Sequence, residues 1–239
     1  MRTDRPKDRT RKISITRNFT KYAQGSVLCE FGDTKVLCTA MVEERVPAFL
    51  KGSGQGWVTA EYSMLPSANR ERKQRDISRL KMDARSTEIQ RLIGRSLRAA
   101  VDMKALGERT IYIDCDVLQA DGGTRVTSIT GGFVALYDAV RSLMKDGLIK
   151  NDPIKNYVAA VSVGIVDNQL LCDLCYEEDS SAMMDMNVVM TDKGEFVELQ
   201  ATAEGRSATR KEMGLLMDLA EAAISEIIQK QKEALGING

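Results

Sequence analysis

Histidine is absent from the 239-residue sequence. Its absence removes the usual general base, the commonest metal-binding side chain, and every Ser-His-Asp or Cys-His scheme of nucleophilic catalysis. Any chemistry must therefore depend on carboxylates, cations, hydroxyls or a bound metal. No Gly-Lys dipeptide occurs either, which excludes a Walker A loop for nucleotide phosphates.

Long hydrophobic runs are also missing, since no uninterrupted stretch approaches the roughly 20 apolar residues of a membrane-spanning helix. The charged amino-terminal segment lacks the apolar centre of a signal peptide. The five cysteines are an odd number and fit a reducing compartment better than a disulfide framework. We therefore expect a cytoplasmic protein with no membrane partner.

One cysteine pair, Cys172 and Cys175, has CxxC spacing inside an apolar segment that is predicted to be a strand from Leu170 to Tyr176. A strand would direct the two side chains to opposite faces. With no second cysteine pair and no histidine, a zinc site is not expected. We interpret both cysteines as strand or core residues.

Basic and acidic residues balance at 34 each, so the net charge gives no indication of a nucleic-acid partner. Local excesses of basic residues can bind a polyanion even so, but many are only solvated surfaces, and the sequence leaves both interpretations open. The basic runs are Arg2, Arg5, Lys7, Arg9, Arg11 and Lys12, and then Arg70, Arg72, Lys73, Arg75, Arg79 and Lys81. A separate cluster of acidic residues, here named the acidic span, consists of Asp173, Glu177, Glu178, Asp179 and Asp185.

The segment DGGTR, Asp121 to Arg125, joins an alternating apolar strand pattern to a helical pattern. Two glycines at such a junction let the backbone approach a ligand closely. The first peptide N–H groups of a helix lack partners within it, and with the helix dipole they attract an anion. Thr124 adds a hydroxyl, and Arg125 a forked cation that suits phosphate oxygens. We predict a phosphate site, with a glycine-rich turn beside a surface arginine as the alternative.

Hairpins that alternate with three long helices predict a mixed-sheet α/β (or α+β) layer structure. Because no Pro-rich or Gly/Ser-rich linker divides the chain, we expect a single domain over residues 1–239. The strand patterns are Ile13–Arg17, Ser26–Phe31, Lys35–Glu43, Trp57–Met64, Ile111–Gln119, Val158–Val166, Leu170–Tyr176, Met186–Thr191 and Phe196–Thr202.

The first helical pattern follows Arg85, where Thr87 and Gln90 fit a capping box, and Gly107 is expected to end this helix. The second follows DGGTR, and the third extends from Thr209 to about Ala234. The first helix carries an apolar stripe at Ile89, Leu92, Ile93, Leu97, Ala100 and Val101.

Six segments resemble ribonuclease PH, in matching order over nearly the whole chain. Several of them are long and specific. The segments are EFGDTKVLCTA (Glu30–Ala40), GQGWVTAEYSMLP (Gly54–Pro66), STEIQRLIGRSLRAAVD (Ser86–Asp102), DCDVLQADGGTR (Asp114–Arg125), VAAVSVGIV (Val158–Val166) and DMNVVMT (Asp185–Thr191).

The resemblance implies a ribonuclease PH-like fold and a phosphorolytic 3′ to 5′ exoribonuclease, a tRNA nucleotidyltransferase. Such an enzyme trims tRNA 3′ ends and, by extension, acts in rRNA processing or degradation. Inorganic phosphate is the co-substrate, and nucleoside diphosphates are released. The resemblance also implies Mg²⁺ or Mn²⁺ and a homohexamer built as a trimer of dimers.

The resemblance assigns the attacking phosphate to Arg85, Gly123, Thr124 and Arg125. A phosphate nucleophile arrives already ionised, so the lack of histidine is no obstacle. The enzyme's tasks are then to hold two anions together and to lower the charge on the scissile phosphodiester. From the residues alone, an arginine such as Arg85 is more often a surface cation than a phosphate ligand.

By the same resemblance, Asp179 and Asp185 match the paired catalytic acids near the metal, and hard oxygen ligands suit Mg²⁺ or Mn²⁺. Without the resemblance, we would assign these two acids to a solvated loop and to the start of a strand. Two rival functions remain. One is an inactive ring subunit that binds RNA as a scaffold, against which the presence of both arginines and both acids argues. The other is a hydrolytic nuclease that uses the same acids and releases monophosphates without phosphate.

The second basic run falls where the family has a loop that faces the RNA path, and Arg72 and Arg75 align with basic positions there. Ser67 departs from the family pattern, which has arginine, and this leaves the strength of the RNA contact open. Phosphate contacts from Arg72 and Arg75 would be independent of base sequence and sensitive to salt.

Overall fold

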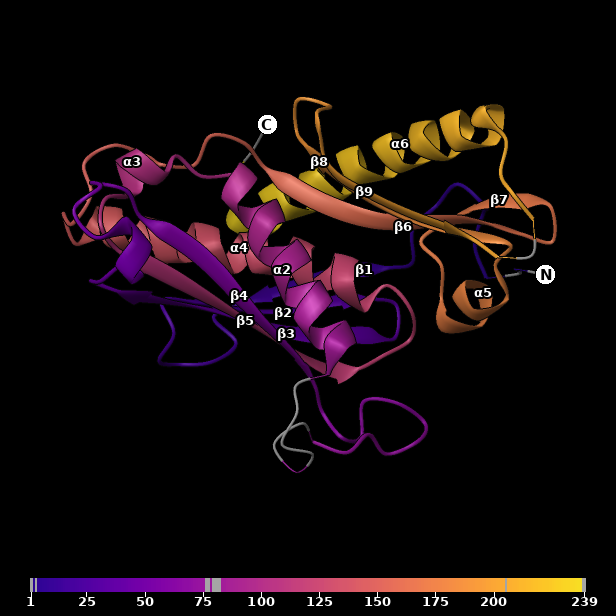
Figure 1. Cartoon of the computed structure of the whole chain (residues 1–239), viewed down its shortest axis with the longest axis horizontal. Helices are drawn as coiled ribbons and strands as arrows, with labels where there is room; N and C mark the ends of the chain where they lie inside the picture. Colours follow the sequence, from indigo (N-terminus) through magenta and orange to yellow (C-terminus); the bar gives the residue numbers. More distant parts are fainter. Residues whose placement is uncertain (1, 3, 76–77, 79–82, 205, 238–239) are drawn as a thin grey trace.

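The structure is a computed structural model that describes residues 2, 4–75, 78, 83–204 and 206–237, and it consists of two sheets and three long helices in layers (Figure 1). The first sheet has the strand order β1-β2-β3-β5-β4, and its neighbours are antiparallel except β4 and β5. Its strands are β1 (Ile13–Arg17), β2 (Gly25–Phe31), β3 (Thr34–Glu43), β4 (Trp57–Met64) and β5 (Thr110–Gln119), with the short 3-10 helix η1 (Ala48–Leu50) before β4.

The parallel pair β4 and β5 requires a crossover connection, which α2 (Ala84–Ala99) provides. Four residues of the predicted apolar stripe, Ile89, Leu92, Ile93 and Leu97, lie on this helix and are buried, which confirms its buried face. Ala100 and Val101 are buried too, but they follow the end of the helix. Alternate residues of β2, β3 and β5 face the same core, as the strand patterns predicted.

The predicted start of this helix is wrong. Asp83 is the N-cap of α2, so Arg85 lies in the first turn instead of preceding the helix. Thr87 lies inside the helix, where its hydroxyl donates to the Asp83 carbonyl (3.1 Å), and it cannot form the expected capping box. A threonine inside the first turn can satisfy its hydroxyl on a carbonyl four residues earlier, so the sequence pattern was ambiguous.

The predicted end of this helix is wrong too. α2 ends at Ala99, and a separate short helix, α3 (Met103–Leu106), follows. The Asp102 side chain accepts hydrogen bonds from the peptide N–H groups of Lys104 and Ala105, which starts a new helix instead of continuing the old one. Gly107, at φ +70°, therefore ends α3.

The second sheet has the strand order β7-β6-β8-β9, and all its neighbours are antiparallel. Every residue of β6 is buried, as expected for a strand that is covered on both faces, and α4 and α6 both contact it. The elements are α4 (Thr124–Lys145), β6 (Val158–Val166), β7 (Gln169–Cys172), β8 (Met184–Thr191), β9 (Phe196–Ala203) and α6 (Arg210–Leu235). The Thr209 hydroxyl and Glu212 form a capping box at the start of α6.

The predicted strand from Leu170 to Tyr176 is too long. β7 ends at Cys172, and the chain turns at Asp173, whose φ is +54°, into the short helix α5 (Tyr176–Ser181). Acidic residues in the first turn favour a helix start, and Glu178 accepts the Cys175 peptide N–H (3.0 Å). Cys172 is a core residue as expected, but Cys175 is the N-cap of α5 and not a strand residue.

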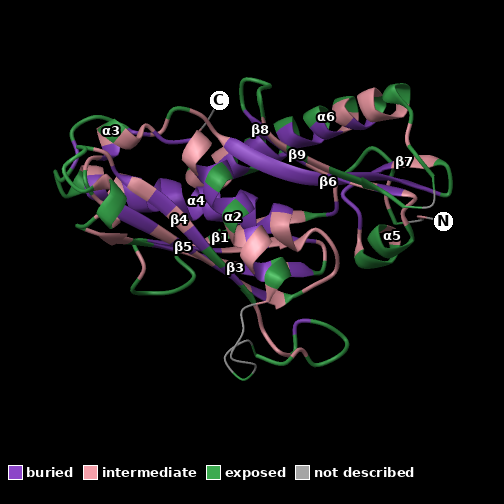
Figure 2. Cartoon of the chain, viewed as in Figure 1, coloured by how far each residue is buried: buried purple, intermediate pink, exposed green. Residues whose placement is uncertain are grey.

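A single cluster of buried apolar side chains includes residues of both sheets and of α2, α4 and α6. α4 is buried along most of its length because it lies between β2 and β3 on one side and β6 on the other (Figure 2). The mixed α/β layers expected from the sequence are thereby confirmed. None of the helices in the described ranges is long and apolar enough to cross a membrane.

Candidate active site

The DGGTR segment, here named the anion loop (Asp121–Arg125), joins β5 to α4 as predicted. Gly122 and Gly123 have φ values of +75° and +66°, in the left-handed region that favours glycine. A Cβ atom on Gly122 would lie 2.6 Å from the Leu174 carbonyl oxygen, so only glycine fits there. Gly123 is the N-cap of α4, and no described side chain caps that helix. The first peptide N–H groups of α4 are therefore available to an anion.

The side chains that follow the two glycines are held by neighbours from other elements. The Thr124 hydroxyl shares a hydrogen bond of 2.8 Å with the Tyr62 hydroxyl at the end of β4. The Arg125 guanidinium donates to the Gln200 side-chain oxygen of β9 (2.8 Å) and pairs with Glu88 of α2 (3.4 Å). Arg125 is thus oriented before any ligand arrives.

Arg85 lies in the first turn of α2 with its side chain exposed. Within the described residues it makes no hydrogen bond or ion pair, so its guanidinium is available to an anion. Its charge nevertheless acts on this site: burial raises the pKa of Tyr62 and of Asp179, and the positive charge of Arg85 opposes both increases.

The two predicted acids lie on consecutive elements, Asp179 on α5 and Asp185 near the start of β8. Neighbouring protein atoms displace water from the carboxyl of Asp179 and raise its pKa, although the residue as a whole is exposed, and the charges of Arg85 and Arg125 oppose this increase. Burial also raises the pKa of Asp185, and repulsion by Asp179 raises it further. The fold therefore brings both acids and both arginines into one electrostatic environment.

The two carboxylates fit a hydrated Mg²⁺ or Mn²⁺. Such an ion usually keeps several waters and is held by one or two carboxylates together with substrate phosphate oxygens. In the described ranges no group of three or more histidine, cysteine or acidic side chains converges on one point, so a metal cage built from protein ligands alone does not fit. The repulsion between Asp179 and Asp185 is of the kind that a divalent cation relieves.

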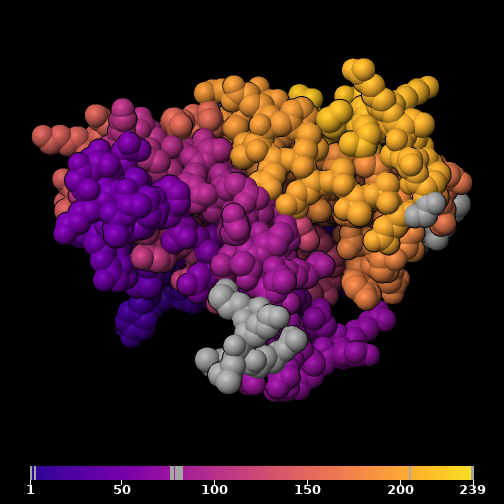
Figure 3. Space-filling view, in the orientation of Figure 1, coloured from indigo at the N-terminus to yellow at the C-terminus, as the bar shows by residue number. Residues whose placement is uncertain are grey.

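The described part of the second basic run, residues 70–75, lies in a loop beside the anion loop, since the Ala120 peptide N–H donates to the carbonyl of the preceding Ala68 (2.9 Å). In the space-filling view this loop, coloured purple to magenta, projects at the lower edge of the molecule (Figure 3). Arg70 in the loop lies 3.4 Å from Glu177 of α5. Arg72 and Arg75 are both exposed, which fits a contact with an RNA strand. The predicted basic residues Arg79 and Lys81 lie outside the described residues.

Several cations in the first basic run form hydrogen bonds or ion pairs with other parts of the protein. Arg2 donates to both carboxylate oxygens of Glu178 (2.7 and 2.6 Å), and Arg5 donates to the Asp173 carbonyl (2.7 Å). Arg11 forms a buried ion pair with Asp173 (2.7 Å). Three of the six cations therefore bind residues of the acidic span. The first basic run is thus neither a free polyanion site nor a fully solvated surface.

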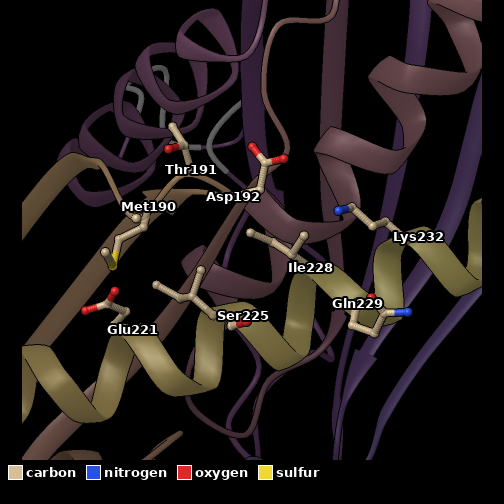
Figure 4. A pocket seen from close by; sticks show the side chains of 10 residues that line it. Met190, Thr191, Asp192, Glu221, Ser225, Ile228, Gln229 and Lys232 are labelled. Carbon is tan, nitrogen blue, oxygen red and sulfur yellow. The ribbon is translucent and has the colours of Figure 1, made fainter. Parts of the chain in front are cut away.

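A cavity lies away from these residues, between α6 and the end of β8 (Figure 4). Its volume is about 200 Å³, and its lining includes Thr191, Asp192, Glu221 and Lys232. Asp185 lies six residues before Thr191 on β8, or about 20 Å along an extended strand. The cavity is therefore not part of the candidate site.

Five residues of this region were not predicted as site residues: Arg11, Tyr62, Glu88, Asp173 and Gln200. Arg11 and Asp173 were noted only as members of the first basic run and of the acidic span. Tyr62 carried a usable signal, because it lies at the carboxyl end of a predicted strand that is followed by a helix. Parallel neighbours end at the same edge of a sheet, but the sequence does not show that β4 and β5 are neighbours. The other four act through partners that are distant in the sequence.

Comparison with solved structures shows close similarity of fold over nearly the whole chain. Rice (Oryza sativa) Rrp46 matches with a TM-score of 0.79 and 16% identity, covering 97% of this chain and 98% of that one. The Archaeoglobus fulgidus exosome with RNA bound to the active site matches with a TM-score of 0.80 and 22% identity, covering 95% and 90%. An archaeal exosome core matches with a TM-score of 0.76 and 22% identity, covering 95% and 89%.

Family models match the sequence in two consecutive parts. Residues 9–142 match domain 1 of the 3′ exoribonuclease family, and residues 156–223 match domain 2 of the same family. The first match contains the anion loop and Arg85, and the second contains Asp179 and Asp185. The chain therefore belongs to the ribonuclease PH family of 3′ exoribonucleases.

Proposed function

We propose that the protein is a phosphate-dependent 3′ to 5′ exoribonuclease that trims tRNA 3′ ends and releases nucleoside diphosphates. The observation that supports the proposal is that the charges of Arg85 and Arg125 act on the carboxyl of Asp179, and that of Arg125 on Asp185, beside the uncapped start of α4. We assign the two arginines and this helix start to a cationic subsite, and the two aspartates to an acidic subsite.

The cationic subsite would hold the attacking phosphate. Peptide N–H groups of α4, the Thr124 hydroxyl and the two guanidinium groups offer hydrogen-bond donors to its oxygens, and charge-assisted bonds of this kind are strong. Gln200 and Glu88 hold Arg125 in place. Binding two anions in a fixed orientation removes much of the entropic barrier to their reaction.

The reaction itself needs little proton transfer by the protein. An oxygen of hydrogen phosphate attacks the terminal phosphodiester, the bond from phosphorus to the 3′ oxygen breaks, and that oxygen gains the proton that the hydrogen phosphate carried, which makes the new RNA 3′ hydroxyl. The terminal nucleotide leaves as a nucleoside diphosphate. A bound Mg²⁺ or Mn²⁺, held by Asp179 and Asp185 with water, would lower the negative charge on the scissile phosphoryl group.

The exposed basic loop would guide the RNA. Arg72 and Arg75 can contact backbone phosphates without reading bases, which suits a strand that is shortened one nucleotide at a time. The proposed working form is a homohexamer, a trimer of dimers, in the cytoplasm, and rRNA ends are proposed as further substrates.

Product analysis tests the proposal. A labelled tRNA with a short 3′ extension is incubated with the purified protein and Mg²⁺, with and without phosphate. We expect nucleoside diphosphates only when phosphate is present. Nucleoside monophosphates formed without phosphate would instead identify a hydrolytic nuclease, and RNA binding without any product would identify a scaffold subunit.

A further inference from the structure

Arg11 and Asp173 form the most deeply buried ion pair of the described chain, between the amino-terminal segment and the turn before α5. Their side chains are 6% and 0% exposed. We propose that they are positioning residues, which hold the anion loop and α5 in a fixed relation to each other. This inference rests on the proposed function, because the two segments carry its cationic and acidic subsites.

The ion pair has the geometry of a fork. Arg11 Nε donates to Asp173 Oδ2 (2.9 Å), Arg11 Nη2 donates to Oδ1 (2.7 Å), and the Arg11 peptide N–H also donates to Oδ2 (2.7 Å). Bidentate pairs of this kind fix orientation as well as distance. Lysine cannot reproduce the fork, because its ammonium group is a single point of charge.

The same guanidinium reaches the anion loop. Arg11 Nη1 donates to the Asp121 carbonyl, and Nη2 lies 3.4 Å from the Gly122 carbonyl oxygen. These carbonyls belong to the two residues before Gly123, the N-cap of α4. Any rotation of this loop that re-aimed the α4 N–H groups would therefore break bonds to Arg11.

Asp173 is fixed to the acidic side of the site. Its peptide N–H donates to the Ser162 carbonyl (2.6 Å), and the Ser162 hydroxyl accepts the Leu174 N–H (3.0 Å). The Tyr176 N–H then donates to the Asp121 carboxylate across the junction (3.3 Å). α5 follows directly, and a helix of only six residues depends on such tertiary contacts for its position.

A role in stability alone makes a different prediction. Removal of one partner from a buried ion pair is destabilising, because the remaining charge loses its counter-charge. If stability were the whole role, a folded variant would keep its catalytic rate. If the pair aligns two subsites, a folded variant should bind phosphate and RNA separately but turn over slowly, because a misplacement of about 1 Å can cost on the order of 100-fold in rate.

The test compares Arg11→Lys with a matched control, Arg17→Lys. Arg17 forms the same fork with Asp138 (2.9 and 2.6 Å) and also donates to a carbonyl, that of Ala234 (3.1 Å), but it contacts neither subsite. Both variants should lower the Tm. At a temperature where both are folded by circular dichroism, Arg11→Lys should lower kcat by about 10- to 100-fold and change the phosphate KM by less than about threefold. Arg17→Lys should leave both constants unchanged.

Hydrogen–deuterium exchange gives a readout that is independent of activity. In Arg11→Lys, amide exchange should rise together in residues 121–126 and 173–182, and in Arg17→Lys it should not. Absence of phosphorolysis in the wild type would refute the proposed function, and the exchange result would still decide the coupling. Unchanged exchange in these two segments would overturn the positioning role.

A second variant removes the buried charge altogether. Arg11→Met with Asp173→Asn leaves a neutral pair, and asparagine tolerates the left-handed backbone of residue 173. We expect this double variant to recover much of the lost Tm while kcat stays low, because the bonds to the anion loop are still missing. Recovery of kcat together with Tm would show that the pair serves stability alone.

Discussion

Arg125 is the residue at which phosphate recognition can be tested most directly, because Gln200 and Glu88 already orient it. Hydrogen bonds to charged groups contribute about 1.5–3 kcal/mol. We therefore expect Arg125→Ala to raise the phosphate KM by about 10- to 100-fold, measured by steady-state kinetics with phosphate varied. Arg141 is a matched control on the same helix, about 24 Å away and paired with Asp152. An unchanged phosphate KM in Arg125→Ala would remove the assignment.

Asp185 is the corresponding test of the acidic subsite. Asparagine has nearly the same shape but carries no charge to hold a divalent cation. Asp185→Asn should nearly abolish turnover while RNA affinity, measured by fluorescence anisotropy, changes little. Normal turnover in this variant would contradict the metal role of Asp185.

The same substitution should increase stability at neutral pH. Burial and the charge of Asp179 raise the pKa of Asp185, so its ionised form destabilises the native state. Asp185→Asn should therefore have a higher Tm than the wild type at pH 7. This gain should disappear as the pH falls below about 3.9, the ordinary pKa of aspartate, because the wild-type carboxyl is then protonated in both states. A Tm difference that is equal at pH 7 and pH 3 would argue against this origin.

At the scale of elements, α5 depends on the amino-terminal segment that docks against it. Burial alone would raise the pKa of Glu178, but hydrogen bonds from Arg2 and the Cys175 N–H, together with the charges of Arg2 and Arg5, lower it to about 2. A depressed carboxyl pKa stabilises the native state above the ordinary pKa of about 4.3, and this contribution is lost as the pH falls through 2.

We expect Glu178→Gln to lower the free energy of unfolding by about 1–3 kcal/mol at pH 7, and the difference from the wild type to shrink between about pH 4 and pH 2. Urea denaturation at several pH values measures both effects. Glu226→Gln is the control, because Glu226 pairs with Arg9 only at the exposed surface, where ion pairs contribute little. Equal effects of the two substitutions would show that the docking of α5 gains nothing from Glu178.

The elements also show where sequence patterns are ambiguous. Strand and helix types were predicted correctly for all the long segments, because their apolar periodicity extends over many residues. The errors fall at boundaries, at Asp83, at Asp102 and after Cys172. At each of these positions a local hydrogen bond or a left-handed residue decides the conformation, and an apolar pattern does not record either feature.

At the scale of the whole molecule, RNA binding should depend on salt through the basic loop. Each cation that contacts a phosphate of single-stranded RNA contributes about 0.7 to the slope of log affinity against log salt concentration. Arg72→Ala and Arg75→Ala should each weaken RNA binding and reduce this slope by about that amount. Lys150→Ala removes an exposed cation from the loop after α4 and should change neither. An affinity that is indifferent to salt would mark the loop as a solvated surface.

The proposed ring assembly is the second test at this scale. Light scattering coupled to size-exclusion chromatography should give a mass six times that of the 26.4 kDa chain. Dissociation on dilution should pass through the dimer if the ring is a trimer of dimers. A mass that stays at that of one chain at micromolar concentration would contradict the hexamer.

The sequence by itself determined the class of fold, the long helices and strands, and the chemistry available, because apolar periodicity and residue types are local properties. It also indicated the anion loop, Arg85, Asp179 and Asp185, since glycines before a helix and the resemblance to ribonuclease PH are both visible in one dimension. Only the tertiary structure decided that the amino-terminal arginines bind the acids before and within α5, and that Tyr62 and Gln200 hold the anion loop. Those pairings join segments up to 176 residues apart, and the order of strands and helices in space, which the sequence does not state, selects them.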